Sequence, residues 1–160
     1  MKVQFTKKST AEVLERYIPK EAMAYVLSLF AQYKVKFKIV APRKSKLGDF
    51  RSGLKGELPQ ITVNGNLNKY AFLITTIHEF AHLKTFLEYR FNVQAHGKEW
   101  KRNFVELMVP ILDLKVLPKD IENALIQSFT NVKASSCTDR NLYRVLRNYD
   151  DLNPGEILLE

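Results

Sequence analysis

Charged and apolar residues alternate along the segment from Lys34 to Val40, up to the apolar pair that ends it. A period of two predicts a half-buried β-strand that turns its lysines toward water. Two shorter strands are predicted over residues 47–53 and 60–64, because glycines and a proline punctuate the chain around them. The first half of the chain therefore predicts a small antiparallel or mixed sheet of about three strands.

Apolar residues at helical spacing surround these strands and predict several helices. The first helix is expected to begin near Ser9 or Thr10, and the last one after Thr138 or Asp139. Four further helices are expected between them, over residues 19–30, 67–89, 100–108 and 119–129. The helix over 67–89 is apolar nearly all round, which is typical of a buried helix. Together with the strands, this pattern predicts an α+β fold.

The predicted buried helix carries two histidines four residues apart, His78 and His82, with Glu79 directly after the first. Four residues advance a helix by about 400°, so the two imidazoles stack within roughly 40° of each other and can hold one Zn²⁺. Glu79 lies about 100° round the helix from His78, where a carboxylate can act as a general base toward water. This H-E-x-x-H pattern is that of zinc metallopeptidases.

Chance is the competing explanation, because H-E-x-x-H also occurs in unrelated chains. Three features favour a metal site. Charged and polar side chains are costly on an otherwise apolar helix unless something satisfies them. The polar positions form a narrow stripe spaced by three or four residues, at Thr75, His78, His82, Thr85 and Tyr89. The chain has only three histidines, and the third, His96, follows shortly after this helix.

His96 is the predicted third ligand, because a ligand from outside the helix must complete the site. Gly97 allows a tight turn beside it, and Trp100 is expected to anchor the next helix in the core. Glu99 and Glu88 are the competing third ligands, and Glu88 is disfavoured because it lies on the motif helix itself. The alternative for His96 is an ordinary surface loop position. Three protein ligands and an open fourth position are typical of a catalytic zinc site.

Length and composition predict a single domain over residues 1–160, with 46% hydrophobic and 26% charged residues. No apolar run reaches the length of about 18 residues that a membrane span needs, and the first eight residues lack the apolar core of a secretory signal. The single cysteine, Cys137, excludes an internal disulfide framework and a four-cysteine zinc site, and it is expected to be an inert thiol. These features predict a cytoplasmic protein with no membrane partner.

The net charge of +8 favours polyanions as partners, nucleic acid above all. The basic residues of the first half gather at Arg43, Lys44, Lys46, Arg51 and Lys55, with Lys98, Lys101 and Arg102 as a second group. This distribution motivates an alternative function, a nucleic-acid-binding protein whose zinc site is not catalytic. A solvated strand edge explains the same charges without any partner.

Four separated blocks, in order along the chain, together resemble the SprT-like zinc metalloprotease domain: residues 46–51 (KLGDFR), 61–64 (ITVN), 78–82 (HEFAH) and 96–100 (HGKEW). The resemblance covers about residues 10–110, and residues 111–160 are expected to form a helical extension. The family includes Spartan, which degrades proteins crosslinked to DNA. The resemblance implies a zincin-like fold in which His78, His82 and His96 hold Zn²⁺ and Glu79 is catalytic. The cysteine zinc ribbon of many members has no counterpart here.

The first hypothesis for function is a zinc-dependent endopeptidase acting on protein substrates, with DNA as a candidate partner in the repair of DNA–protein crosslinks. In such an enzyme one edge strand lies along the cleft and pairs with the substrate backbone, and Ile61–Asn64 is the predicted edge strand. A zinc hydrolase acting on a small amide or ester is a third hypothesis. A narrow pocket would favour the small substrate, whereas an open cleft beside an edge strand would count against it.

Overall fold

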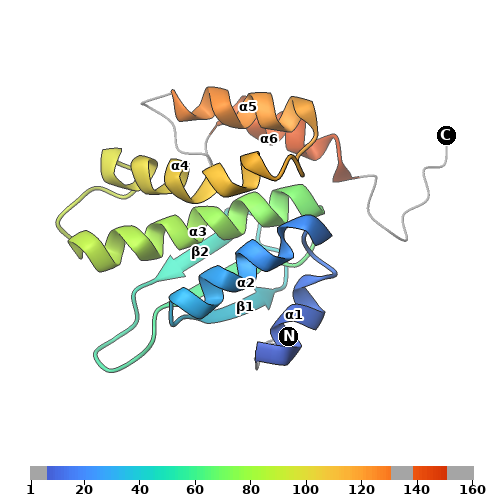
Figure 1. Cartoon of the computed structure of the whole chain (residues 1–160). Helices are drawn as coiled ribbons and strands as arrows, with labels where there is room; N and C mark the ends of the chain where they lie inside the picture. The colour runs from blue at the N-terminus through green and yellow to red at the C-terminus, as the bar shows by residue number, and fades with distance from the viewer. Residues whose placement is uncertain (1–6, 131–138, 151–160) are drawn as a thin grey trace.

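The computed structural model describes residues 7–130 and 139–150, and within these ranges it is an α+β structure (Figure 1). Its elements are α1 (Lys7–Leu14), the 3₁₀-helix η1 (Lys20–Ala22), α2 (Met23–Gln32), β1 (Lys36–Val40), β2 (Gly48–Arg51), β3 (Gln60–Asn64), α3 (Lys69–Tyr89), α4 (Lys98–Asp113), α5 (Lys119–Phe129) and α6 (Arg140–Arg147). Six α-helices and three strands in the described ranges confirm the predicted α+β class. None of the described helices is both long and apolar enough to cross a membrane.

The three strands form one mixed sheet in the order β1-β3-β2. β3 pairs in parallel with β1, so that Phe37 lies beside Ile61, and antiparallel with β2, so that Gly48 lies beside Val63. The prediction that Ile61–Asn64 forms an edge strand is wrong, because β3 has a hydrogen-bonded neighbour on each side. β2 is the edge strand that packs against α3.

Alternation along the strands gives the sheet one apolar face, which joins the hydrophobic core, and one polar face. Arg43 lies across the polar face and donates from Nε to Oδ1 of Asn64 and from Nη1 to Oγ1 of Thr62, both at 2.9 Å. Nδ2 of Asn64 in turn donates to the carbonyl oxygen of Lys46 at 2.7 Å. These bonds fasten the segment 43–47 to β3 and thereby set where β2 begins.

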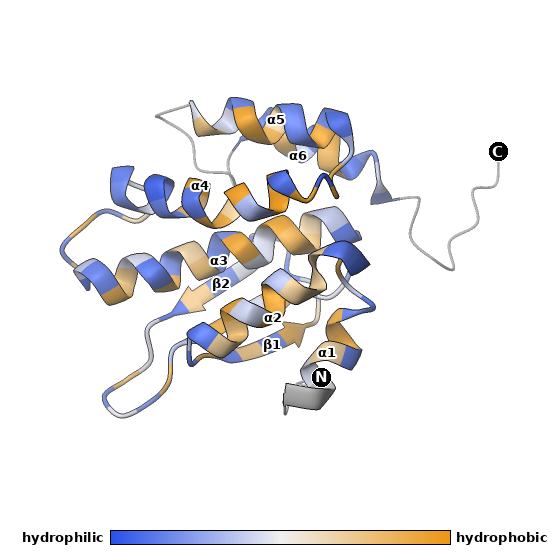
Figure 2. Ribbon diagram, in the orientation of Figure 1, coloured by the Kyte–Doolittle hydropathy of each residue, from blue (hydrophilic) through white to orange (hydrophobic). Residues whose placement is uncertain are grey.

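Helix α3 lies between the sheet and α4, with α5 beyond α4, and α6 packs against α5 and α3 (Figure 1). The side chain of Asn68 caps its start by accepting hydrogen bonds from the main-chain N–H groups of Tyr70 and Ala71. Every residue from Ala71 to Ala81 is buried, as the apolar sequence predicted. Figure 2 shows hydrophobic residues along α2, α3 and β1, the elements that enclose the core.

Two helix boundaries differ from the prediction. α1 already begins at Lys7, so Ser9 and Thr10 lie inside it and not at its cap. α4 continues through Pro110 to Asp113, beyond the predicted end near residue 108. The buried Ile111 extends the apolar face of α4, and the N–H of Leu114 donates to the carbonyl oxygen of Pro110, so the helix resumes its hydrogen bonding after the proline. Cys137 and residues 1–6, which carry the predictions about the thiol and the secretory signal, lie outside the described residues.

Candidate metal centre

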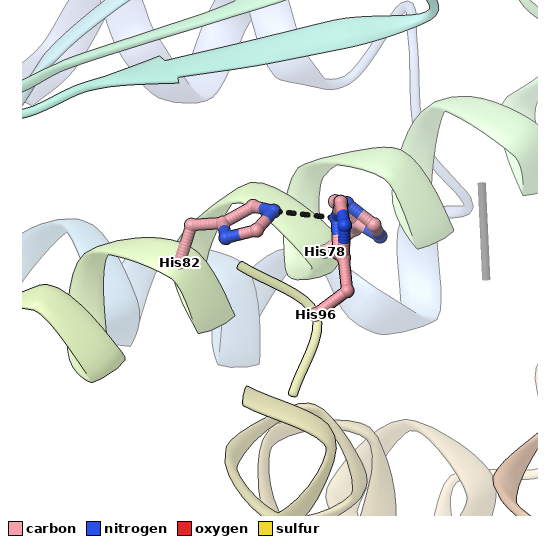
Figure 3. A group of neighbouring side chains, drawn as sticks. All are labelled: His78, His82 and His96. Atoms are coloured by element: carbon pink, nitrogen blue, oxygen red, sulfur yellow. Dashed lines mark hydrogen bonds between the residues drawn. The ribbon is translucent and has the colours of Figure 1, made fainter. Parts of the chain in front are cut away.

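The three histidines of the chain converge at one point beside α3 (Figure 3). Nε2 of His96 lies 3.1 Å from Nε2 of His78 and 2.9 Å from Nε2 of His82. Each residue offers one ring nitrogen, and these atoms all lie within 4.8 Å of one another. His78 is buried and the other two are partly buried, so this group could hold a metal ion that remains reachable from solvent. The structure thus brings the three predicted ligands together.

The geometry suits a cation better than hydrogen bonding between imidazoles. A neutral imidazole has one N–H, so Nε2 of His96 can donate to only one of the two nitrogens that face it. Two nitrogens held at 2.0–2.1 Å by a tetrahedral ion lie about 3.3 Å apart. The distances of 2.9 and 3.1 Å found here are close to that value. The three histidines therefore fit a transition-metal ion.

Burial keeps the histidines in the neutral form that binds metals. It lowers the pKa of His78 well below the ordinary value and the pKa of His82 to about 3, and the charges of neighbouring histidines add to both shifts. Burial, followed by the charge of Lys101, also lowers the pKa of His96. At neutral pH the three side chains can therefore bind a metal without first releasing protons.

The backbone of His96 has an unusual conformation, and its ring packs against Trp100 of α4. His96 has a φ of 62°, in the left-handed region that a non-glycine residue rarely adopts. Gly97 is the N-cap of α4, and Trp100 lies in the first turn of that helix. The Trp100 ring centroid lies 4.6 Å from that of His78, 5.4 Å from that of His82 and 4.8 Å from that of His96. Because Nε1 of Trp100 also donates to the carbonyl oxygen of His78 at 3.3 Å, α4 holds the third histidine against the other two.

Glu88 and Glu99, the competing third ligands, are not part of the metal-binding group found among the described residues. The Glu88 carboxylate accepts hydrogen bonds from Nδ2 of Asn103 at 2.8 Å and Nζ of Lys84 at 2.9 Å, and these bonds lower its pKa. Asn103 is buried and donates to Oγ1 of Thr85 at 2.9 Å as well. This network fastens α4 to α3 just beyond the histidines.

Glu79 lies next to the histidines with its side chain buried, and its Oε2 is 4.0 Å from Nε2 of His78. Burial raises the pKa of Glu79 to about 8, with a further increase from the charge of Asp49, while Arg43 and Lys46 act in the opposite direction. A cation held by the histidines would favour the ionised carboxylate and bring this pKa down. The predicted catalytic glutamate is therefore placed beside the candidate metal position.

Two residues of β2 complete the surroundings of the site. A Cβ on Gly48 would lie 2.9 Å from Oε2 of Glu79, so the strand approaches the glutamate as closely as a glycine permits. The ring of Phe50 lies nearly parallel to that of His82, at 6.3 Å and 14°. In the sequence, Gly48 indicates a bend in the chain, and Phe50 does not differ from an ordinary strand residue. Their spacing of two is the signal that places both on the side of β2 that faces α3.

Comparisons of the chain with protein-family models, with curated proteins and with solved structures find no match. The resemblance to SprT-like proteases therefore rests on the four sequence blocks alone.

Proposed function

We propose that the chain is a zinc-dependent endopeptidase with a zincin-like fold, related to the SprT-like metalloproteases. The observation that carries this proposal is the convergence of three histidine Nε2 atoms next to the buried carboxylate of Glu79. Three histidine ligands and an open fourth position are typical of catalytic zinc, whereas structural zinc is closed by four protein ligands. The metal-binding group in the described part of the chain contains His78, His82 and His96 and no fourth ligand.

Each residue has a separate task in this proposal. The three histidines hold Zn²⁺, which when bound polarises a scissile carbonyl and lowers the pKa of water. Glu79 is the general base: its carboxylate accepts a proton from the attacking water and passes it to the leaving amine. The burial of Glu79 limits contact of its carboxylate with bulk water, and Gly48 leaves the space in which that carboxylate lies.

The edge position of β2 supports a polypeptide as substrate. Within the sheet, β2 is hydrogen-bonded only to β3, so its other edge can pair with an extended peptide beside the histidines. Main-chain pairing accepts peptides of any sequence, which suits an endopeptidase that acts on proteins. A small amide or ester would make no use of this edge.

The proposal is tested by zinc analysis together with cleavage of an unfolded protein such as casein. The wild-type protein should hold about one zinc ion per chain, as a three-ligand site requires, and chelation of the metal should stop cleavage. Glu79→Gln should retain zinc and lose at least about 10²-fold in rate, because it removes the general base. His96→Ala should lose zinc and cleavage together. Full activity of Glu79→Gln, or wild-type protein that takes up no zinc, would overturn the proposal.

A second candidate function, nucleic-acid binding, is favoured by the charges on the polar face of the sheet. Strand register places Lys36 and Lys38 of β1 and Arg51 of β2 on the face across which Arg43 lies. Asp49 is the one acidic strand residue on this face among the described residues. A duplex or single strand that neutralises these cations would release counterions, so its affinity should fall steeply with salt.

The matched test for nucleic-acid binding uses Lys38→Gln and Arg51→Gln on the polar face and Arg144→Gln on α6 as the control. Binding of a labelled DNA fragment is measured across a series of salt concentrations. Each change on the polar face should reduce the salt slope by about one, and the control should leave it unchanged. Affinity that does not depend on salt would eliminate this second function.

A further inference from the structure

Three phenylalanine rings form a continuous series that leads outward from the candidate metal centre. The ring of Phe50 on β2 lies 6.3 Å from the ring of His82 and 6.0 Å from that of Phe86 on α3. The ring of Phe86 lies 5.2 Å from that of Phe91, which follows α3. We call Phe50, Phe86 and Phe91 the phenylalanine patch. The patch connects a candidate metal ligand with the protein surface.

Exposure increases along the phenylalanine patch. Phe50 and Phe86 are partly buried, whereas Phe91 is 81% exposed. Packing of the core therefore accounts for the inner rings but not for Phe91. The preceding residue, Arg90, ends α3 with a φ of 56°, so the chain turns sharply just before Phe91. An exposed aromatic ring that extends an apolar surface next to a site is typical of a binding surface.

The position of β2 identifies an extended peptide as the ligand of the patch. Phe50 belongs to this strand, whose edge is free to pair with a further strand. The ring centroids along the series are separated by 5.2 to 6.3 Å. Alternate side chains of an extended peptide lie about 6.6 Å apart on one side of the backbone, which is a similar spacing. A peptide paired with β2 beside the histidines would therefore bring a side chain of a neighbouring residue onto the patch.

One guanidinium group lies against the middle ring of the phenylalanine patch. Cζ of Arg90 lies 5.1 Å from the centre of the Phe86 ring. This cation favours a peptide with an acidic residue beside the apolar one and disfavours a peptide with a basic residue there.

We propose that the phenylalanine patch is a specificity site, which receives a bulky apolar or aromatic side chain of the peptide substrate within two residues of the scissile bond. An acidic residue next to that side chain strengthens binding through Arg90. The inference rests on the proposed endopeptidase function, because it names the substrate class of the same site. The edge of β2 aligns the backbone of the peptide substrate, and the phenylalanine patch selects the side chain near the scissile bond.

The test compares two fluorogenic peptides that differ at one position near the scissile bond, one with Phe and one with Ser, both chosen from a library cleaved by the zinc-loaded protein. Wild type should cleave the Phe peptide with a higher kcat/KM. Phe91→Ser should reduce this preference about three- to tenfold, the usual worth of one aromatic pair. Phe91→Tyr should preserve the preference, and so should Ile126→Ser, which changes an exposed apolar residue of α5 far along the chain.

Equal cleavage of both peptides by wild type, or an unchanged preference in Phe91→Ser, would overturn the specificity site while leaving the protease function intact. A zinc-loaded wild type that cleaves no peptide would overturn the protease function instead. In that case the patch is tested by fluorescence anisotropy with the same labelled peptides. Tighter binding of the Phe peptide that is lost in Phe91→Ser supports the patch, and equal binding of the two peptides overturns it. Sedimentation shows whether the wild type is a dimer. If it is, and if Phe91→Ser is a monomer, the patch binds a second copy of the chain, and the specificity site is overturned.

Discussion

Gly48 of β2 lies directly against Glu79 of α3, because a Cβ on this glycine would be 2.9 Å from Oε2 of the carboxylate. The same Cβ would be 2.7 Å from Cγ2 of Thr75. Both neighbours are buried on α3, where closely packed side chains leave little room for movement. The missing side chain of Gly48 therefore allows β2 to approach α3 and determines the space that the Glu79 carboxylate occupies.

Gly48→Ala should displace the Glu79 carboxylate while leaving the three histidines in place. A misplacement of about 1 Å at a reacting group can cost roughly 10²-fold in rate, so we expect kcat to fall by about one to two orders of magnitude. Zinc content should stay near that of the wild type. Steady-state cleavage of a fluorogenic peptide and elemental analysis of the same protein samples provide the measurement.

Gly65→Ala is the matched control for this substitution. A Cβ at Gly65 would meet Cγ2 of Ile39 at 3.1 Å, which is also tight, but this contact lies in the sheet and not at Glu79. The Gly65→Ala substitution should reduce the stability of the protein slightly and leave kcat unchanged. If Gly48→Ala were as active as Gly65→Ala, the close approach of β2 would have no part in placing the general base.

The elements that carry the site were predictable from local patterns. The strand over 60–64 and the end of the long helix at Tyr89 agree with the structure, because strand alternation and the apolar run are both properties of neighbouring residues. His96 could be placed near the helix histidines because few residues separate it from them. Its left-handed backbone could not be predicted, since the surroundings of His96 include Trp100 and the histidines of α3, contacts that local sequence patterns do not reveal.

Strand order and close approaches were not predictable, because they depend on residues that are distant in sequence. The sequence predicts Ile61–Asn64 as the edge strand along the cleft. The structure buries Thr62 and Asn64 under Arg43 and the segment 43–47 and places β3 in the centre of the sheet. The role of β2 as the edge strand beside the histidines therefore became evident only from the three-dimensional arrangement.

Trp100 should report metal binding directly, because it is the only tryptophan of the chain and contacts all three histidine rings. Addition of Co²⁺ to the metal-free protein is expected to quench its fluorescence, and excess chelator should restore the emission. His96→Ala should require a much higher Co²⁺ concentration for the same quenching. Equal quenching of the wild type and His96→Ala, or of the urea-unfolded wild type, would show that the ion binds elsewhere.

The left-handed backbone of His96 predicts that glycine at this position gives a more stable protein than alanine does. A non-glycine residue in the left-handed region costs of order 1–3 kcal/mol, whereas glycine adopts it without a steric penalty. In the metal-free protein, His96→Gly should therefore be more stable than His96→Ala by about 1 kcal/mol, and both should lose zinc binding. Urea unfolding of the two metal-free variants provides the comparison. Equal stabilities would mean that the loop relaxes to another conformation when His96 is replaced.

Asn103→Ala should weaken both the fold and the metal site, because Asn103 joins α4 to α3. Its buried amide donates to Oγ1 of Thr85 and Oε1 of Glu88 and accepts from Nζ of Lys84, all within 2.8 to 2.9 Å. Loss of this amide removes three hydrogen bonds, one of them to the buried Thr85, for which we expect a loss of about 1–3 kcal/mol in the free energy of urea unfolding. Since α4 also holds His96 through Trp100, Co²⁺ affinity measured by Trp100 quenching should fall as well.

Glu106→Ala is the control for this last substitution. Glu106 also lies on α4 and approaches Lys84 at 3.6 Å, but its side chain is 63% exposed. Surface ion pairs of this kind contribute roughly 0–1 kcal/mol, so stability and Co²⁺ affinity should stay close to those of the wild type. If the two variants were equally stable, the buried amide would not be what fastens α4 to α3. If Asn103→Ala lost stability but kept full Co²⁺ affinity, the position of His96 would be set within the loop itself and not by α4.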